Sequence, residues 1–239
     1  MLFRQFFDHV SSTYTYLLAD DETREAALID PVLEQAERDL EIVCQLGLTL
    51  GHVFDTHVHA DHITAAARLR EETGAHTVAG ERGPACADVH VGDGDVVRFG
   101  RIALGVLATP GHTDDSVSYL LLDPDHAAQP GDRVFTGDAL MIRAAGRTDF
   151  QNGDAGCLYD SITLKLFALP DATLVYPAHD YRGLTVTTIR EEKRWNARIA
   201  GRSRDEFIAV MNALHLPEPR HLREAVDANR AGGRAPVQG

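Results

Sequence analysis

The stretch Thr56-His57-Val58-His59-Ala60-Asp61-His62 places four metal-binding side chains within six residues. It directly follows the run 52–55 (HVFD), which predicts a short buried strand. Just beyond a strand the chain is still extended, so residues two apart point the same way and His57 and His59 are expected to face one point in space. Asp61 and His62 follow at the expected entry to a helix. Imidazole nitrogens and carboxylate oxygens suit zinc or iron, so we predict a metal site at the end of this strand.

Three further polar side chains also follow predicted strands. His112 comes after the strand 101–108, Asp138 after 133–136 and His179 after 173–176. A glycine directly precedes His112 and Asp138 and lets the backbone turn closely. Each signal is weak alone, but their joint occurrence at strand ends indicates one functional site.

The pattern of apolar residues predicts a mixture of strands and helices. Strands are expected at 13–19, 26–30, 52–55, 95–99, 101–108, 116–122, 133–136 and 173–176, and helices at 32–46, 63–73, 156–168, 186–199 and 204–214. Because helices both follow and interrupt the strands, a layered α/β architecture is favoured over an all-β sandwich. We expect one domain over residues 1–230 and a disordered Gly/Pro-rich tail over 231–239. Cys44, on the apolar stripe of the first helix, is expected in the core.

The composition excludes several classes of protein. Of the 239 residues, 36 are Asp or Glu and 23 are Lys or Arg, which gives a formal net charge of −13. This acidic balance argues against nucleic acid or an anionic membrane surface as a partner. We expect no membrane span, because no apolar run approaches the ~18–20 residues needed, and no secretory leader. The three cysteines are few and far apart, which predicts a cytoplasmic location.

The order of the polar motifs resembles that of the metallo-β-lactamase superfamily. The chain carries HxHxDH at 57–62, then Gly111-His112, Gly137-Asp138 and finally Ala178-His179. The resemblance covers residues 10–215. It implies an αββα metallo-β-lactamase sandwich as a single domain with short C-terminal helices and with its metal site at one edge of the two sheets.

A finer resemblance is to the persulfide dioxygenases, also called sulfur dioxygenases. It rests on 135–140 (FTGDAL), 146–151 (GRTDFQ) and 176–181 (YPAHDY), with supporting matches at 191–196 and 207–217. It implies a non-haem iron oxidoreductase in which one Fe(II) per chain is held by His57, His112 and Asp138. Some relatives have Cys directly before the GRTDF motif, where this chain has Ala145, so that Cys is not expected to be needed for the chemistry.

Four metal-binding side chains then remain outside the implied ligand set: His59, Asp61, His62 and His179. We expect them to hydrogen-bond to the ligands or bound water and orient them. By their number they could instead hold a second metal, as in the related glyoxalase II enzymes, and the sequence spacing leaves both possibilities open. A set of two His and one carboxylate leaves open positions for substrate and O2 together, which favours one iron.

The resemblance also implies a substrate and a partner. The expected reaction is oxidation of glutathione persulfide by O2 to sulfite and glutathione, and the expected assembly is a homodimer. Arg147 is a candidate for binding a glutathione carboxylate. Asp149 is a candidate for binding the substrate ammonium or for orienting Arg147, and Tyr181 for a hydrogen bond to the substrate.

Two other functions stay open at this point. One is a glyoxalase-II-like hydroxyacylglutathione hydrolase, which would use a dinuclear metal site and a metal-bound hydroxide. Such enzymes usually carry a longer basic C-terminal region, whereas this chain has little after residue 215 beyond Arg220 and Arg223. The other is a non-catalytic persulfide or iron sensor, for which no interaction motif is present.

Overall fold

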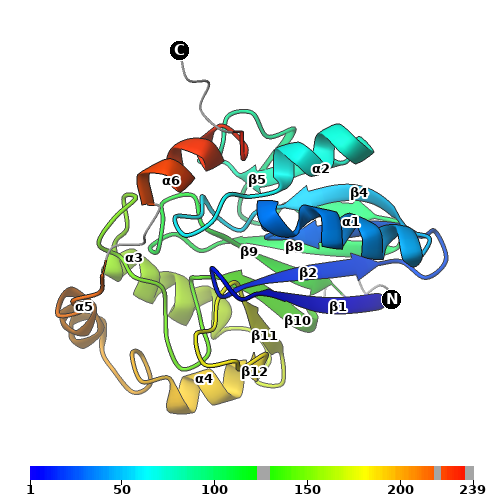
Figure 1. Cartoon of the computed structure of the whole chain (residues 1–239). Coiled ribbons are helices and arrows are strands. Elements are labelled where there is room, and N and C mark those ends of the chain that lie inside the picture. The colour runs from blue at the N-terminus through cyan, green and yellow to red at the C-terminus, as the bar shows by residue number, and fades with distance from the viewer. Residues whose placement is uncertain (123–129, 218–221, 235–239) are drawn as a thin grey trace. The chain divides into compact units, whose positions relative to one another are not determined.

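A computed structural model describes residues 1–122, 130–217 and 222–234 of the chain (Figure 1). The chain folds as two compact units. Unit 1 comprises residues 1–91, 98–102 and the segment from 218 onward, and unit 2 comprises 92–97 and 103–217. Two six-stranded sheets organise these units. Every helix in the described part of the chain is too short or too polar to cross a lipid bilayer.

The sheet of unit 1 has the strand order β1-β2-β3-β4-β5-β6. Its strands are β1 (Leu2–Asp8), β2 (Thr13–Ala19), β3 (Glu25–Ile29), β4 (Thr49–Phe54), β5 (His76–Gly80) and β6 (Val89–Val91). The pairs β1–β2 and β2–β3 are antiparallel, whereas β3, β4, β5 and β6 run parallel to one another. Because the carboxyl ends of parallel strands meet at the same edge of a sheet, the segments that follow β3 and β4 are brought together there.

Two helices, α1 (Ala36–Gln45) and α2 (Ala66–Thr73), cover one face of this sheet (Figure 1). They bury an apolar cluster against it: Leu17, Ala19, Ala26, Leu28, Ala36, Val43, Leu50, Val53, Ala65, Ala66, Leu69 and Ala75. A third helix, α6 (Leu222–Arg230), comes from the far end of the chain. The segment that follows α6 returns to α2, where the Ala67 amide donates to the Gly232 carbonyl over 3.0 Å.

The second sheet has the strand order β12-β11-β10-β9-β8-β7. Its strands are β7 (Val96–Phe99), β8 (Ile102–Ala108), β9 (Val117–Leu122), β10 (Pro130–Gly137), β11 (Leu174–Pro177) and β12 (Thr187–Thr188). In this sheet β10 and β11 run parallel, whereas the pairs β8–β9, β9–β10 and β11–β12 are antiparallel. The segments that follow β10 and β11 therefore emerge at the same edge of the sheet.

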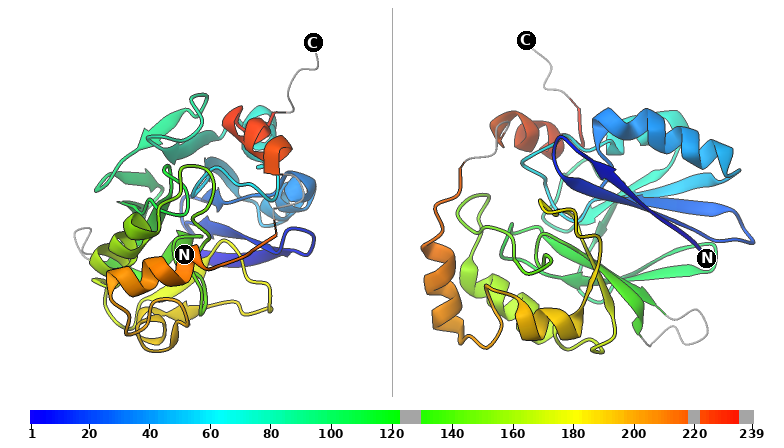
Figure 2. Two further views of the ribbon diagram at one scale, coloured as in Figure 1. Left: turned by 90° about the vertical axis from the view of Figure 1, so that its left-hand side faces the viewer. Right: turned by 60° about the horizontal axis from the view of Figure 1, so that its bottom comes forward.

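The helices of unit 2 are α3 (Ala155–Asp160) with a π-helical extension over Ser161–Leu166, α4 (Ile189–Trp195) and α5 (Arg204–Asn212). They gather on one face of the sheet, as both views in Figure 2 show, and share an apolar cluster that includes Leu158, Ile189 and Phe207. Their first turns begin at polar caps, since the side chains of Asp154, Thr188 and Ser203 each accept a hydrogen bond from a main-chain amide.

The predicted elements between residues 13 and 214 are present, with shifted ends. The expected helix 186–199 is shorter, because 187–188 pair with β11 before α4 begins. β1, β5, β6, β12 and α6 were not predicted. The expectation that Cys44 lies in the core is wrong, because Cys44 is exposed on α1. The single domain over 1–230 stays a prediction, and within the expected tail the residues 235–239 lie outside the described part of the chain.

Candidate metal centre

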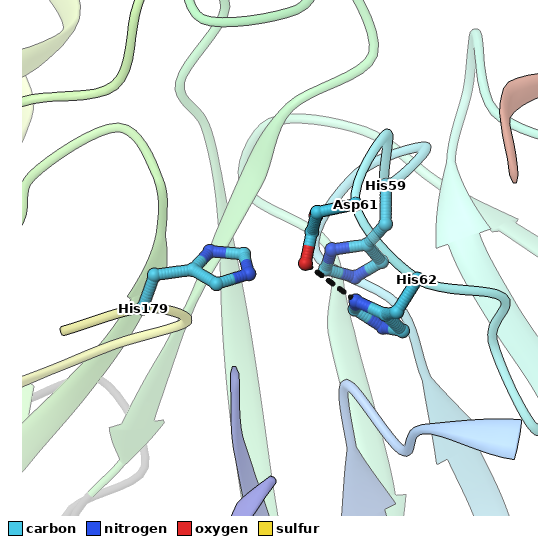
Figure 3. A group of neighbouring side chains, drawn as sticks. All are labelled: His59, Asp61, His62 and His179. Atoms are coloured by element: carbon cyan, nitrogen blue, oxygen red, sulfur yellow. Dashed lines mark hydrogen bonds and ion pairs between the residues drawn. The ribbon is translucent and has the colours of Figure 1, made fainter. Parts of the chain in front are cut away.

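The loop that follows β4 carries the histidine-rich motif of unit 1. It has no regular secondary structure between Phe54 and α2, yet His57, His59 and His62 are all buried. The rings pack closely, with centroids 4.1 Å apart for His57 and His59 and 4.3 Å apart for His59 and His62. Figure 3 shows His59, Asp61 and His62 projecting from this loop, with the ion pair between Asp61 and His62 marked.

Asp30, directly after β3, is the acceptor that organises this loop. It is buried and has a positive φ of 51°. Its carboxylate accepts hydrogen bonds from the Thr56 amide (2.7 Å), from Thr56 Oγ1 (2.9 Å) and from His59 Nε2 (3.1 Å). Asp30 was not predicted as a site residue. The sequence signal that could have identified it is a carboxylate at the end of the expected strand 26–30.

These contacts determine which ring nitrogen of His57 is available to a metal. Thr56 has a single hydroxyl proton, which it donates to Asp30. Thr56 Oγ1 therefore acts as acceptor toward His57 Nδ1, 3.0 Å away, and Nδ1 carries the ring proton. We assign this tautomer from the hydrogen-bond network. Nε2 of His57 is left with the lone pair that a metal needs.

His59 lies in a markedly acidic environment. Its burial lowers the tendency to become charged, but the carboxylates of Asp30, Asp61 and Asp55 outweigh burial and raise the pKa of His59 to about 9. Possible ligand atoms of Asp30, Asp55 and His59 lie within 4.8 Å of one another. His62 donates from Nδ1 toward Asp61 Oδ2 at 3.0 Å. In this part of the loop, the charges of the neighbouring carboxylates therefore favour the protonated form of His59.

Unit 2 contributes its own donor set: His112 beyond β8, Asp138 directly after β10 and His179 just beyond β11. All three are buried. His179 Nδ1 donates to Asp138 Oδ1 over 2.7 Å, and His112 Nε2 lies 3.7 Å from Asp138 Oδ2. Within unit 2 the structure thus brings these three strand-end residues close together, and their role as one functional site stays a prediction.

The orientation of His112 is set by main-chain atoms. His112 Nδ1 lies 2.7 Å from the carbonyl oxygen of Arg147, which can only accept, so Nδ1 carries the proton and Nε2 the lone pair. Gly146 makes this approach possible. A Cβ on Gly146 would lie 2.5 Å from the Asp138 carbonyl oxygen and 2.7 Å from His112 Nδ1, closer than real side chains come. The glycine of the GRTDF motif is therefore needed for packing.

A buried polar cluster holds the turn between Asp138 and Gly146. Glu192 is fully buried, accepts from the Arg143 amide at 2.9 Å and pairs with the Arg143 guanidinium. Asn196 Nδ2 donates to the Ala144 carbonyl at 2.9 Å and to Glu192 at 2.8 Å. Glu192 and Asn196, which lie in the 191–196 match, thus stabilise the segment between Asp138 and the Arg147 carbonyl that contacts His112.

The proposed substrate residues occupy different environments. The guanidinium of Arg147 pairs with both carboxylate oxygens of Asp149, at 2.6 and 2.7 Å, and donates to the Pro217 carbonyl at 2.7 Å. The hydrogen bond from Arg147 lowers the pKa of Asp149. Tyr181 is 72% exposed, and its ring is stacked nearly parallel to that of His179, with centroids 6.2 Å apart. Asp149 is thus paired with Arg147, and the roles of Arg147, Asp149 and Tyr181 toward a substrate stay predictions.

Comparisons with known proteins place this geometry in context. A model of the metallo-β-lactamase superfamily matches residues 10–83 and 87–179. ETHE1 of Mus musculus, named a mitochondrial persulfide dioxygenase, is 50% identical over 238 residues, covering 99% of this chain and 91% of the relative. The crystal structure of ETHE1 from Myxococcus xanthus is 62% identical with a TM-score of 0.93, covering 98% of this chain and all of that one.

A more distant solved structure is that of TTHA1623 in a di-iron-bound form. It is 26% identical with a TM-score of 0.65, covering 81% of this chain and 98% of that one. Together these matches confirm the expected metallo-β-lactamase fold.

Proposed function

Since this chain belongs to the metallo-β-lactamase superfamily and, within it, to the persulfide dioxygenases, we propose that it oxidises glutathione persulfide with one Fe(II) as its metal. The chain is an oxidoreductase, and its superfamily and its His and Asp clusters support a metal cofactor. The observation that carries the proposal is the 50% sequence identity to a persulfide dioxygenase over 99% of this chain.

The proposed ligands are His57, His112 and Asp138, and the chemistry of these side chains fits iron. His57 and His112 each keep a lone pair on Nε2, because Nδ1 donates to an oxygen in both cases. Asp138 Oδ1 accepts from His179, which leaves Oδ2 as the proposed ligand atom. Two neutral imidazoles and one carboxylate are the donor set of many non-haem iron oxygenases.

The overall reaction is RSSH + O2 + H2O giving RSH and H2SO3, where RSH is glutathione. Bound Fe(II) supplies the electronic coupling that lets triplet O2 react with a closed-shell sulfur. The chain supplies position and charge. His179 and Asp30 hold ligand side chains in one orientation, and we propose that Arg147 and Tyr181 bind the glutathione part of the substrate.

We propose a single metal, with His59, Asp61, His62 and His179 outside the ligand set. His59 donates from Nε2 to Asp30, His62 from Nδ1 to Asp61, and His179 from Nδ1 to Asp138. Each of the three imidazoles thus holds a carboxylate, and we propose that these residues orient the ligands. TTHA1623 was solved with two irons, so the count of metals per chain is the sharpest point to test.

The decisive experiment is to purify the protein without oxygen, measure its metal content and follow oxygen uptake with glutathione persulfide. The expected result is one iron per chain, with one O2 consumed and one sulfite formed per persulfide. Two zinc ions per chain, with hydrolysis of a glutathione thioester and no oxygen uptake, would identify the glyoxalase-II-like hydrolase instead. Neither activity, combined with retention of a partner protein, would favour the sensor.

We also propose a homodimer and a cytoplasmic location, both of which rest on the sequence. Light scattering coupled to size-exclusion chromatography tests the dimer, with a mass of twice 26.1 kDa as the expected result. Cell fractionation tests the location, and it matters because the mouse relative is named mitochondrial.

A further inference from the structure

Asn229 is a buried polar residue near the end of α6, far in sequence from the histidine-rich loop. It is 1% exposed. An amide removed from water in this way is costly unless its polar atoms find partners. Asn229 finds three, and all three are main-chain groups of the loop between His59 and Thr64.

The geometry of these contacts is close to ideal. Nδ2 donates to the His59 carbonyl at 2.9 Å and to the His62 carbonyl at 2.8 Å. Oδ1 accepts from the Thr64 amide at 2.9 Å. A single side chain thereby binds the main chain at both ends of the segment that carries Asp61 and His62. The loop has no regular secondary structure, so its main-chain groups must find such partners elsewhere.

The end of α6 reinforces this clamp. The Gly233 amide donates to the Ala228 carbonyl at 2.8 Å, and the Gly232 carbonyl accepts from Ala67 in the first turn of α2. Gly233 has a φ of 87°, and a Cβ there would overlap the Thr64 carbonyl oxygen. The chain therefore approaches the loop at a distance that only glycine permits.

Main-chain positions in the loop determine where its imidazoles point. The His59 ring packs against the rings of both His57 and His62. A shift of the His59 main chain would therefore displace the His57 ring as well. Because Asn229 holds the His59 carbonyl, it acts on the proposed ligand His57 through one intermediate residue.

We propose that Asn229 is a positioning residue for the metal-ligand loop: its amide holds the main chain at His59, His62 and Thr64, and so aims His57 at the metal. This inference rests on the proposed function, in which His57 is an iron ligand. It assigns to α6, which carries no ligand itself, a role in tuning metal affinity.

The test compares Asn229→Ala with two variants of the same helix. Ala225→Gly weakens α6 at a buried position without touching the three hydrogen bonds, and Asp227→Ala changes an exposed side chain. The measurements are Fe(II) affinity by anaerobic competition with a chelator, the electron paramagnetic resonance spectrum of the nitric oxide adduct, and the melting temperature by circular dichroism.

Asn229→Ala is expected to bind Fe(II) about tenfold to a hundredfold more weakly and to show an altered spectrum. Ala225→Gly is expected to melt earlier while its affinity and spectrum stay those of the wild type, and Asp227→Ala should match the wild type throughout. If Asn229→Ala and Ala225→Gly lose affinity in proportion to their loss of melting temperature, Asn229 is merely structural and the inference is overturned.

A second variant covers the case in which Asn229→Ala does not fold. Asn229→Asp keeps the acceptor for the Thr64 amide but has no donor for the two carbonyls, so the same loss of affinity is expected and unchanged affinity would overturn the inference. If the wild type binds Zn(II) but not Fe(II), the proposed function fails, and the same competition with Zn(II) still tests Asn229.

Discussion

The two units orient their metal-binding side chains by different means. In unit 1, His57 is held through side chains, since the Thr56 hydroxyl connects its Nδ1 to the carboxylate of Asp30. In unit 2, His112 is held by the main-chain carbonyl of Arg147, and Gly146 leaves room for the contact. The imidazole tautomer therefore depends on side-chain identity in unit 1 and on backbone shape in unit 2.

The largest expected effect is that of Asp138→Ala in unit 2, compared with His59→Ala in unit 1. Asp138 is the only anion in the proposed ligand set, so its loss should leave the purified protein without iron. His59→Ala should retain more iron, because His59 is placed outside that set. Metal analysis of anaerobically purified protein decides the matter, and equal loss of iron in His57→Ala and His59→Ala would refute the mononuclear assignment.

Gly146→Ala tests the role of backbone shape. The added methyl group would meet the Asp138 carbonyl and the His112 ring, and overpacking of this kind costs about 1–3 kcal/mol. We expect a lower melting temperature together with reduced iron content. Gly51→Ala in β4 is the matched control, because the nearest atom to its Cβ lies 3.9 Å away. Similar behaviour of the two variants would show that Gly146 is not special.

Thr56→Val tests the role of a side chain in unit 1. The substitution keeps the shape but removes the hydroxyl that joins His57 to Asp30, and loss of such a contact typically weakens metal binding tenfold to a hundredfold. Chelator competition measures the change. Thr56→Ser, which restores the hydroxyl, should recover the wild-type affinity, and failure to do so would mean that the methyl group matters more.

Arg147→Ala makes the complementary test in unit 2. The hydrogen bond to His112 comes from the main chain, so iron content should stay near that of the wild type. If the guanidinium binds a glutathione carboxylate, its removal should lower kcat/KM by roughly tenfold to a hundredfold, mainly through KM. Oxygen uptake on glutathione persulfide and on a small persulfide without carboxylates measures this, and an unchanged preference would place glutathione binding elsewhere.

The last expected effect concerns stability and leaves metal binding unchanged: it comes from a buried carboxylate of unit 1 that has few partners. Asp39 is paired with Arg38, and its Oδ2 has no hydrogen-bond partner among the described residues. Burial, only partly offset by Arg38, raises its pKa from 3.8 to about 6. The folded state therefore prefers the protonated form, so the free energy of unfolding should fall as pH rises from about 4 to about 6.

Asp39→Asn should remove that dependence and stabilise the protein at pH 8 by about 2–3 kcal/mol, with little gain near pH 4. Urea denaturation at the two pH values measures the difference. A variant that is less stable than the wild type at pH 8 would show that the pair with Arg38 outweighs the burial of the charge. Asp30, by contrast, is held by three donors, which sharpens the difference between the two carboxylates.

The sequence by itself determined the donor types, their spacing and most of the strands that carry them. His57, His112, Asp138 and His179 were found because each stands beyond an apolar run whose periodicity is local in the chain. The strands β1, β5 and β6 were not predicted, because they are short or partly exposed and lack that periodicity. Helix α6 was not predicted because its sequence is mostly polar and few of its positions are buried, namely Ala225, Ala228 and Asn229.

Only the tertiary structure decided which residues hold the donors in place. Asp30 bonds to Thr56 across 26 positions, the Arg147 carbonyl to His112 across 35, and Asn229 to His59 across 170. A main-chain carbonyl leaves no trace in residue type, and a buried amide looks like any surface Asn until its partners are known. These contacts are produced by strand order and helix packing. They join residues far apart in the sequence, so local sequence patterns do not reveal them.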